Sequence, residues 1–93
     1  MTQAFRAMGE KRKEVRRLSS GQVLIKFSDP GPLEVQGRLV DVSENGFRMI
    51  HSCTTLRSGQ IVEFTHIEAK GQAQVIWNRI TGGAIETGFL VVG

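Results

Sequence analysis

The sequence contains few of the features that cross-link a small protein or hold it in a membrane. Its 93 residues include a single cysteine, Cys53, which has no disulfide partner in the chain, and no tyrosine. No apolar run approaches the ~18 residues that a membrane span requires, and the first residues lack the apolar stretch of a secretory leader. These absences predict an unprocessed protein of a reducing, cytoplasmic compartment, without a membrane span.

Length and composition limit the size of the fold. A chain that is 40% hydrophobic and 23% charged is too apolar for general disorder, and 93 residues are too few for two cores. Five phenylalanines and one tryptophan are its only aromatic residues, so the core must be mostly aliphatic. A single small domain is therefore expected, which excludes a large multi-domain enzyme.

Positive charge is concentrated at the N-terminus. Residues 1–17 carry six lysines and arginines against two glutamates, a net charge of +4, so the rest of the chain carries −1 of the total of +3. A basic arm on a nearly neutral body favours an anionic partner, which could be a nucleic acid, a nucleotide, an acidic lipid surface or an acidic protein. Helical propensity is adequate only around residues 10–17, where little apolar surface could anchor a helix.

From residue 21 onward, short apolar or alternating runs are separated by turn residues, a pattern typical of an all-β protein. Asn45-Gly46 predicts a type I′ hairpin turn, because both residues tolerate a positive φ. Lys70-Gly71 is expected to interrupt the chain before the fifth strand. Six strands at this spacing predict a small antiparallel barrel or sandwich. The expected strands are residues 22–27, 33–42, 47–51, 61–66, 72–78 and 84–92.

The basic arm contains an RxxxR element formed by Arg12 and Arg16. On a helical turn these like charges would lie on one face and repel, unless an anion lay between them. Guanidinium groups bind phosphate oxygens bidentately and stack on planar rings, and a guanine base offers O6 and N7 as paired acceptors. Taken alone, the element is a weak signal and is better interpreted as a solvated run of charge, because basic tails are common.

A second element, DxSxxG, is formed by Asp41, Ser43 and Gly46. Strand alternation places Asp41 and Ser43 on one side of the sheet, and it places Asp41 on the same face as Leu39. A carboxylate beside a hydroxyl can accept hydrogen bonds from the N–H edge of a guanine, and Gly46 allows backbone to approach a ligand closely. The simpler alternative is a set of local turn contacts.

The order and separation of the two elements, with 25 positions from Arg16 to Asp41, closely resemble the PilZ domain family of bacterial cyclic di-GMP receptors. Glu10-Lys11 before the first arginine, the strand Gln74-Val75-Ile76-Trp77 and Gly88-Phe89 in the last strand also resemble the family pattern. The resemblance covers residues 10–92.

The resemblance implies a six-stranded antiparallel barrel whose flexible basic N-terminal arm folds over a bound cyclic dinucleotide. Arg12 and Arg16 would then bind phosphates and stack on guanines, while Asp41, Ser43 and Gly46 would hold a guanine edge. The residues predicted to bind cyclic di-GMP are Lys11, Arg12, Arg16, Arg17, Asp41, Ser43 and Gly46.

Two registers of the arm fit the motif. Lys13 and Arg17 also stand four positions apart, and Leu18 resembles the apolar residue that follows the second arginine in the family. The pair Arg12 and Arg16 is preferred because both members are arginine.

Other candidate sites have weaker support. His51, His66 and Cys53 do not have the spacing of metal ligands, so no metal or cofactor is expected. A nucleophile elbow of the GxSxG type is absent, so we do not expect an enzyme. Trp77 is interpreted as a core or rim residue of the barrel rather than as a stacking platform.

The predicted organisation is a flexible arm at residues 1–17 and a PilZ-like barrel at residues 18–93. The leading hypothesis is a cyclic di-GMP receptor in second-messenger signalling, whose arm changes conformation on binding and signals to an unknown downstream protein. One alternative is a small barrel that binds RNA or DNA through its basic arm, although few aromatic residues are interleaved with its cations. Another is a PilZ-fold scaffold that binds proteins and no nucleotide, against which both intact motifs argue.

Overall fold

The computed structural model describes residues 15–28 and 31–92, and all regular secondary structure in this part of the chain is β-strand. Within these residues, no helix is present that could span a lipid bilayer. The strands are β1 (Arg17–Leu18), β2 (Gln22–Phe27), β3 (Leu33–Val42), β4 (Gly46–His51), β5 (Ile61–His66), β6 (Ala69–Thr81) and β7 (Ala84–Val92).

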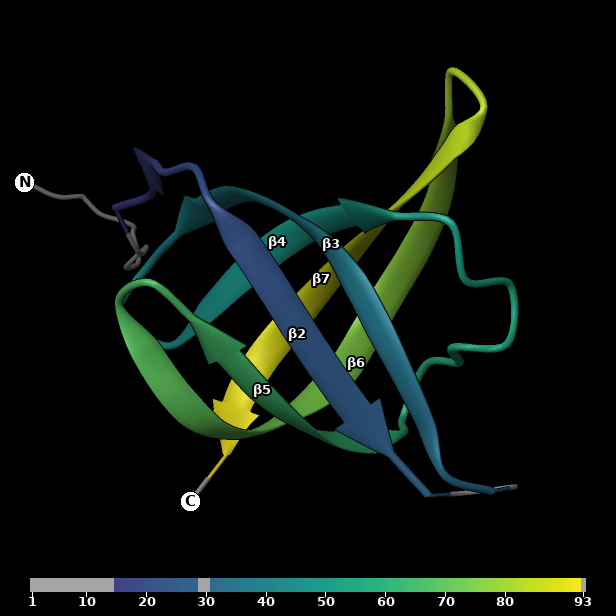
Figure 1. The fold of residues 1–93 in the computed structure, drawn as a ribbon. Coiled ribbons are helices and arrows are strands. Elements are labelled where there is room, and N and C mark those ends of the chain that lie inside the picture. Colours follow the sequence, from purple (N-terminus) through teal and green to yellow (C-terminus); the bar gives the residue numbers. More distant parts are fainter. Residues whose placement is uncertain (1–14, 29–30, 93) are drawn as a thin grey trace, which may run out of the picture.

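The strands form one antiparallel sheet that closes on itself (Figure 1). Their spatial order is β1-β3-β2-β5-β6-β7-β4, and a further pairing between β3 and β4 joins the two ends. Strands β2 to β7 therefore make a closed six-stranded barrel, and β1 is an additional short strand that pairs with the end of β3. The predicted six-stranded antiparallel barrel is confirmed.

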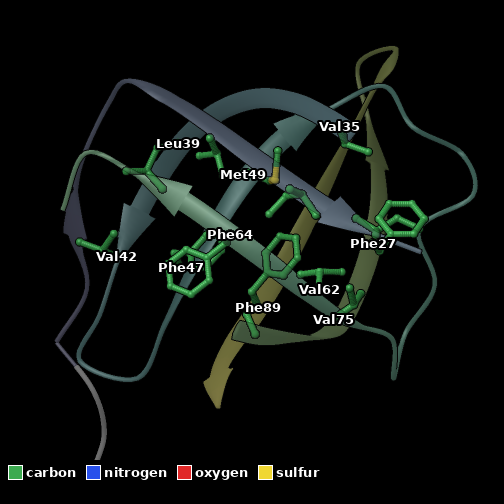
Figure 2. Packing of buried hydrophobic residues seen from close by; sticks show 14 residues of the cluster. Phe27, Val35, Leu39, Val42, Phe47, Met49, Val62, Phe64, Val75 and Phe89 are labelled. Carbon is green, nitrogen blue, oxygen red and sulfur yellow. The ribbon is translucent and has the colours of Figure 1, made fainter. Parts of the chain in front are cut away.

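The inward faces of the barrel strands supply the core. On β2, for example, Val23, Ile25 and Phe27 are buried while the residues between them are partly or fully exposed. Phe47 lies in the middle of the aromatic part of the core, stacked on Phe89 with ring centroids 4.6 Å apart and tilted against Phe64 at 4.8 Å (Figure 2). The other buried hydrophobic residues are Val35, Leu39, Val42, Met49, Leu56, Val62, Ala73 and Val75.

The turn between β3 and β4 differs from the predicted one. The Ser43 N–H donates to the Gly46 carbonyl at 2.9 Å, so Glu44 and Asn45 form a two-residue turn and Gly46 is already the first residue of β4. Gly46 does not have a positive φ, and the prediction of a type I′ turn at Asn45-Gly46 is wrong. Glycine is needed there for space, because a Cβ atom would overlap the carbonyl oxygen of Phe89 in β7.

A bulge in β3 changes which residues share a face. Leu39 is opposite Met49, but Asp41 is opposite Arg48, so one extra residue, Val40, stands in β3. Regular alternation would have placed Asp41 on the core face with Leu39, as the sequence predicted. Because of the bulge, this prediction is wrong. Leu39 and Val42 both lie in the core, and Asp41 lies on the outer face of the barrel.

Three further boundaries differ from the expected ones. The turn before β6 falls at Ile67–Glu68, so Lys70-Gly71 lies inside β6 and does not interrupt it. Strand β6 also runs on to Thr81, and Figure 1 shows the β6–β7 hairpin extending beyond the barrel. The helix expected around residues 10–17 lies mostly outside the described residues, and residues 15–17 are not helical.

A chain of buried and partly buried hydrogen bonds crosses the end of the barrel where β4 ends. The Cys53 N–H donates to His51 Nδ1 at 3.0 Å, so the imidazole proton resides on Nε2 and is donated to Thr87 Oγ1 at 2.6 Å. The Thr87 hydroxyl donates to Asn78 Oδ1, and Asn78 Nδ2 donates to the Leu56 carbonyl at 3.1 Å. Burial lowers the pKa of His51, and this polarity requires the neutral ring.

We expect the stability of the protein to fall as the pH is lowered from 7 to 5. The unfolded chain takes up a proton at His51 near its ordinary pKa of about 6.5, whereas the native ring does not, so protonation favours unfolding by up to ~1.4 kcal/mol per pH unit. Burial also lowers the pKa of His66, which adds to the slope. Urea unfolding at several pH values gives the slope, which should be smaller in a His51→Gln variant. A His51 ring that titrates above pH 6.5 by NMR would contradict this assignment.

Candidate functional site

One row of cross-strand partners crosses the outer face of five strands. Its members are Leu18 on β1, Asp41 on β3, Arg48 on β4, Gly88 on β7 and Trp77 on β6, each directly opposite the next. Residues that face each other across an antiparallel sheet lie on the same side, so the five share one surface. We call this set the outer row. It brings an apolar side chain, an acceptor, a cation and an aromatic ring onto one surface.

Asp41 is the buried charge of the outer row, with only 3% of its surface exposed. Arg48 Nε lies 2.9 Å from Oδ1 and 3.0 Å from Oδ2, its Nη2 also donates to Oδ2, and Arg16 Nε donates to Oδ1 at 3.1 Å. Burial by itself raises the pKa of Asp41, but the hydrogen bonds from Arg48 and then from Arg16 outweigh it and hold the pKa below its ordinary value. The carboxylate is therefore ionised at neutral pH.

Arg16 joins the two sequence motifs. Besides Asp41 Oδ1, its guanidinium contacts Ser43 through Nη1, 3.3 Å from Oγ. The Ser43 hydroxyl also lies 3.4 Å from the Gly46 carbonyl, across the β3–β4 turn. The structure thus brings four of the predicted site residues together: the second arginine of RxxxR, and the aspartate, serine and glycine of DxSxxG.

Arg17 lies apart from this group. Its guanidinium forms a bidentate ion pair with Glu68 in the β5–β6 turn, at 2.7 and 3.2 Å, and Ser19 Oγ donates to the same carboxylate. The hydrogen bonds from Arg17 hold the pKa of Glu68 below its ordinary value. The remaining predicted ligand residues, Lys11 and Arg12, lie outside the described residues, as does Lys13 of the alternative register.

A hollow of about 270 Å³ lies beside the outer row. At its wall the Trp77 indole lies against Gly88, where a Cβ atom would overlap the ring. A second bulge, between Val75 and Trp77, turns this tryptophan to the outer face, so it belongs to the rim and not to the core. The hollow is lined by Arg16, Asn45, Gly46, Phe47, Arg48, Ile76, Trp77, Gly88, Phe89 and Leu90.

Charged side chains continue from the outer row toward the β6–β7 hairpin. Arg48 Nη1 lies 3.6 Å from Glu86 Oε2, and Arg79 Nη2 donates to Glu86 Oε1 at 2.7 Å. The Arg79 guanidinium also lies 5.7 Å from the centre of the Trp77 ring, within cation–π distance. In the described part of the chain, no cluster of three His, Cys, Asp or Glu side chains could hold a metal ion.

Sequence reasoning missed Arg48, which makes the closest contacts to Asp41. The signal that could have found it is the β3–β4 hairpin, because strands joined by a short turn pair residues in a fixed register. Regular pairing outward from Ser43 and Gly46 gives Val42 opposite Phe47 and then Asp41 opposite Arg48. A two-residue turn at Glu44-Asn45 would therefore have predicted the ion pair.

We expect Gly88→Ala to displace the indole that forms the wall of the hollow. A methyl group at this position overlaps the Trp77 ring, so the ring must move away from the sheet. Trp77 is the only tryptophan of the chain, so intrinsic fluorescence should shift to longer wavelength and iodide should quench it more strongly. Gly31→Ala is the matched control, because no atom lies within 4 Å of its Cβ position. An unchanged spectrum in Gly88→Ala would contradict the contact.

No protein-family model matches the chain, and no curated protein matches its sequence. Comparison with solved structures finds clear likeness. The crystal structure of YcgR from Escherichia coli in complex with c-di-GMP superimposes with a TM-score of 0.71 at 17% sequence identity, over 90% of this chain and 39% of that one. The PilZ domain of YcgR with c-di-GMP gives a TM-score of 0.70 at 16% identity, over 90% of this chain and 79% of that one.

These likenesses concern the fold, because the identities are low. The chain spans about two fifths of the full YcgR chain, and most of its isolated PilZ domain. Strands β2 to β7 thus form a barrel of the PilZ type, with the outer row on its surface. The chain has the PilZ fold.

Proposed function

We propose that this domain is a non-enzymatic receptor for cyclic di-GMP. The observation that carries the proposal is the contact of Arg16 with both Asp41 and Ser43, which joins the RxxxR and DxSxxG elements on the outer surface of a PilZ-type barrel. Two structural neighbours of the same fold hold c-di-GMP, which supports the choice of ligand. The proposed activity is reversible binding, without a chemical step. Because cyclic di-GMP is a bacterial second messenger, the proposal places the receptor in the cytoplasm.

The acceptors that now hold Arg16 suit a guanine base. A guanidinium group presents a planar set of N–H donors, and the Watson–Crick edge of guanine likewise presents coplanar N–H donors. The Asp41 carboxylate and the Ser43 hydroxyl, which accept from Arg16 in the structure, would accept from the base in the complex. Arg16 would then turn to a phosphate of the ligand, to which a guanidinium can donate bidentately.

The hollow needs the N-terminal arm to become a complete site. Its volume of about 270 Å³ lies just below the ~300–1,000 Å³ of most small-molecule pockets. Lys11 and Arg12 of the arm would complete the site above the ligand and supply further cations for its two phosphates. On the barrel side, Trp77 forms a wall against which a purine can stack.

The ion pair of Arg17 with Glu68 holds the end of the arm next to Arg16, the residue that we propose exchanges its partners on ligand binding. Arg17 pairs with Glu68 and lies in β1, while Arg16, one residue earlier, reaches the outer row. Residues before Arg17 can therefore change partners without detaching β1 from β3. The predicted ligand contact of Arg17 stays a prediction. We infer that movement of the residues before β1 is the signal that a downstream protein would recognise.

Binding to RNA or DNA has less support in the structure. Single-stranded nucleic acids are bound by exposed aromatic rings among cations. Among the described residues all the phenylalanines are buried, and the tryptophan, Trp77, is half-buried. A scaffold without nucleotide binding would not need the paired acceptors at Asp41 and Ser43.

We expect Arg16→Ala and Asp41→Asn each to weaken cyclic di-GMP binding by at least about tenfold, because each removes charge-assisted hydrogen bonds. Isothermal titration calorimetry at near-physiological salt measures the affinity and the stoichiometry. Arg38→Ala is the matched control, since this exposed β3 arginine lies opposite Ile50, away from the Asp41 pair. Far-UV circular dichroism should show the same β-sheet content in every variant.

GTP and a short RNA distinguish the alternatives. Saturable binding of cyclic di-GMP alone supports the receptor. Binding of the RNA with a steep salt dependence would support the nucleic-acid alternative. If none of the three ligands produces heat or competes, the alternative of a protein-binding scaffold is supported. If all variants bind cyclic di-GMP with equal affinity, Arg16 and Asp41 are not part of the binding site.

A further inference from the structure

Arg48 holds Asp41 from a different part of the structure than Arg16 does. Arg48 lies in β4, hydrogen-bonded on both edges to β3 and β7, whereas Arg16 precedes the two-residue strand β1. The Asp41–Arg48 pair is also a direct cross-strand pair at the β3 bulge. The barrel wall thus supplies one arginine and the arm supplies the other.

A second buried carboxylate fixes Arg48 from the opposite side. Its Nη1 lies 3.6 Å from Glu86 Oε2, and Arg79 in turn binds Glu86 at 2.7 Å. The side chains of Asp41 and Glu86 are 4% and 8% exposed, so both acceptors lie out of water. A guanidinium held between two buried carboxylates has little freedom to leave Asp41.

These contacts determine which hydrogen-bond acceptor sites of Asp41 are taken by Arg48 and which by Arg16. A carboxylate offers about four lone-pair sites on its two oxygens. Arg48 donates to both oxygens, and Arg16 donates only to Oδ1. The side of Asp41 that remains for exchange is therefore the one that Arg16 now occupies.

We propose that Arg48 is a positioning residue of the ligand site: it holds the Asp41 carboxylate in one orientation, with the acceptor side now taken by Arg16 turned toward the incoming base. This inference rests on the proposed function. Lysine cannot replace Arg48 fully, because an ammonium group lacks the planar set of donors that spans both oxygens.

Arg48→Gln and Arg48→Lys test the inference by calorimetry with cyclic di-GMP. We expect Arg48→Gln to bind at least about tenfold more weakly at pH 7, and Arg48→Lys to lie between it and the parent. Arg38→Gln is the matched control, an exposed arginine that lies opposite Ile50 on the outer face, and should bind within about twofold of the parent.

The pH profile separates positioning from a general loss of stability. The charged groups that face Asp41 are Arg16 from the arm and Arg48 from β4, with Glu86 of β7 behind Arg48. Without Arg48, burial opposed by Arg16 alone should raise the pKa of Asp41. A protonated carboxyl group accepts poorly, so the affinity of Arg48→Gln should fall between pH 7 and 5, while that of the parent and of Arg38→Gln stays level.

Each outcome decides the inference. If the parent binds and Arg48→Gln matches it in affinity and pH profile, the positioning role is overturned. If the parent does not bind cyclic di-GMP, the proposed function fails, and carboxyl ¹³C NMR of the unliganded proteins decides instead. A higher Asp41 pKa in Arg48→Gln, but not in Arg38→Gln, supports positioning, and an equal pKa overturns it. If Arg48→Gln does not fold, the affinity of Arg48→Lys decides: weaker binding than the parent supports positioning, and an equal affinity overturns it.

Discussion

The outer row depends on one buried carboxylate being on the correct side of the sheet. Asp41 is almost without exposed surface, and an ionised group in that position is tolerated only when it is paired and hydrogen-bonded. A regular β3 would direct this charge into the core, toward Phe47 and Leu39. The extra residue at Val40 turns it outward, where two arginines meet it. The bulge therefore makes the polar centre of the site compatible with an apolar barrel interior.

The two arginines on Asp41 are held by different numbers of contacts, and the proposed function uses this difference. Arg48 is part of the barrel wall and is held on its other side by Glu86, so its exchange would expose two buried carboxylates. Arg16 is held by single contacts to Asp41 and Ser43. A ligand that supplies equivalent N–H donors can replace Arg16 at modest cost, while replacing Arg48 would leave uncompensated charge. Under the proposed function, ligand binding and the release of Arg16 from Asp41 are then parts of one exchange.

The sequence predicted the fold better than the details of the site. Alternation located β2, β5 and most of β3, because each has one buried and one exposed face over this length. The bounds of β7 were also predicted, although four consecutive residues of this strand, 86–89, are buried. Motif spacing also predicted that Arg16, Asp41 and Ser43 would meet. The partner Arg48 was missed because the turn was placed one residue too late, at Asn45-Gly46, although the two-residue turn at Glu44-Asn45 sets Arg48 opposite Asp41. The outward directions of Asp41 and Trp77 could not be predicted, because both follow from bulges. A bulge shifts the register by one residue through backbone geometry, for which the residues Val40 and Ile76 give no sign.

The two bulges lie on either side of the same surface, and their joint effect is what makes it a site. One brings Asp41 outward on β3, the other brings Trp77 outward on β6, and between them Arg48 and Gly88 follow the regular pairing. Glycine at position 88 leaves room for the indole to lie over this residue, so the ring forms one wall of the hollow. A regular barrel of the same length would have hidden both side chains inside. Departures from strand alternation thus supply the chemistry, while the regular strands between them supply the rigid support that holds an acceptor, a cation and a ring in fixed relation.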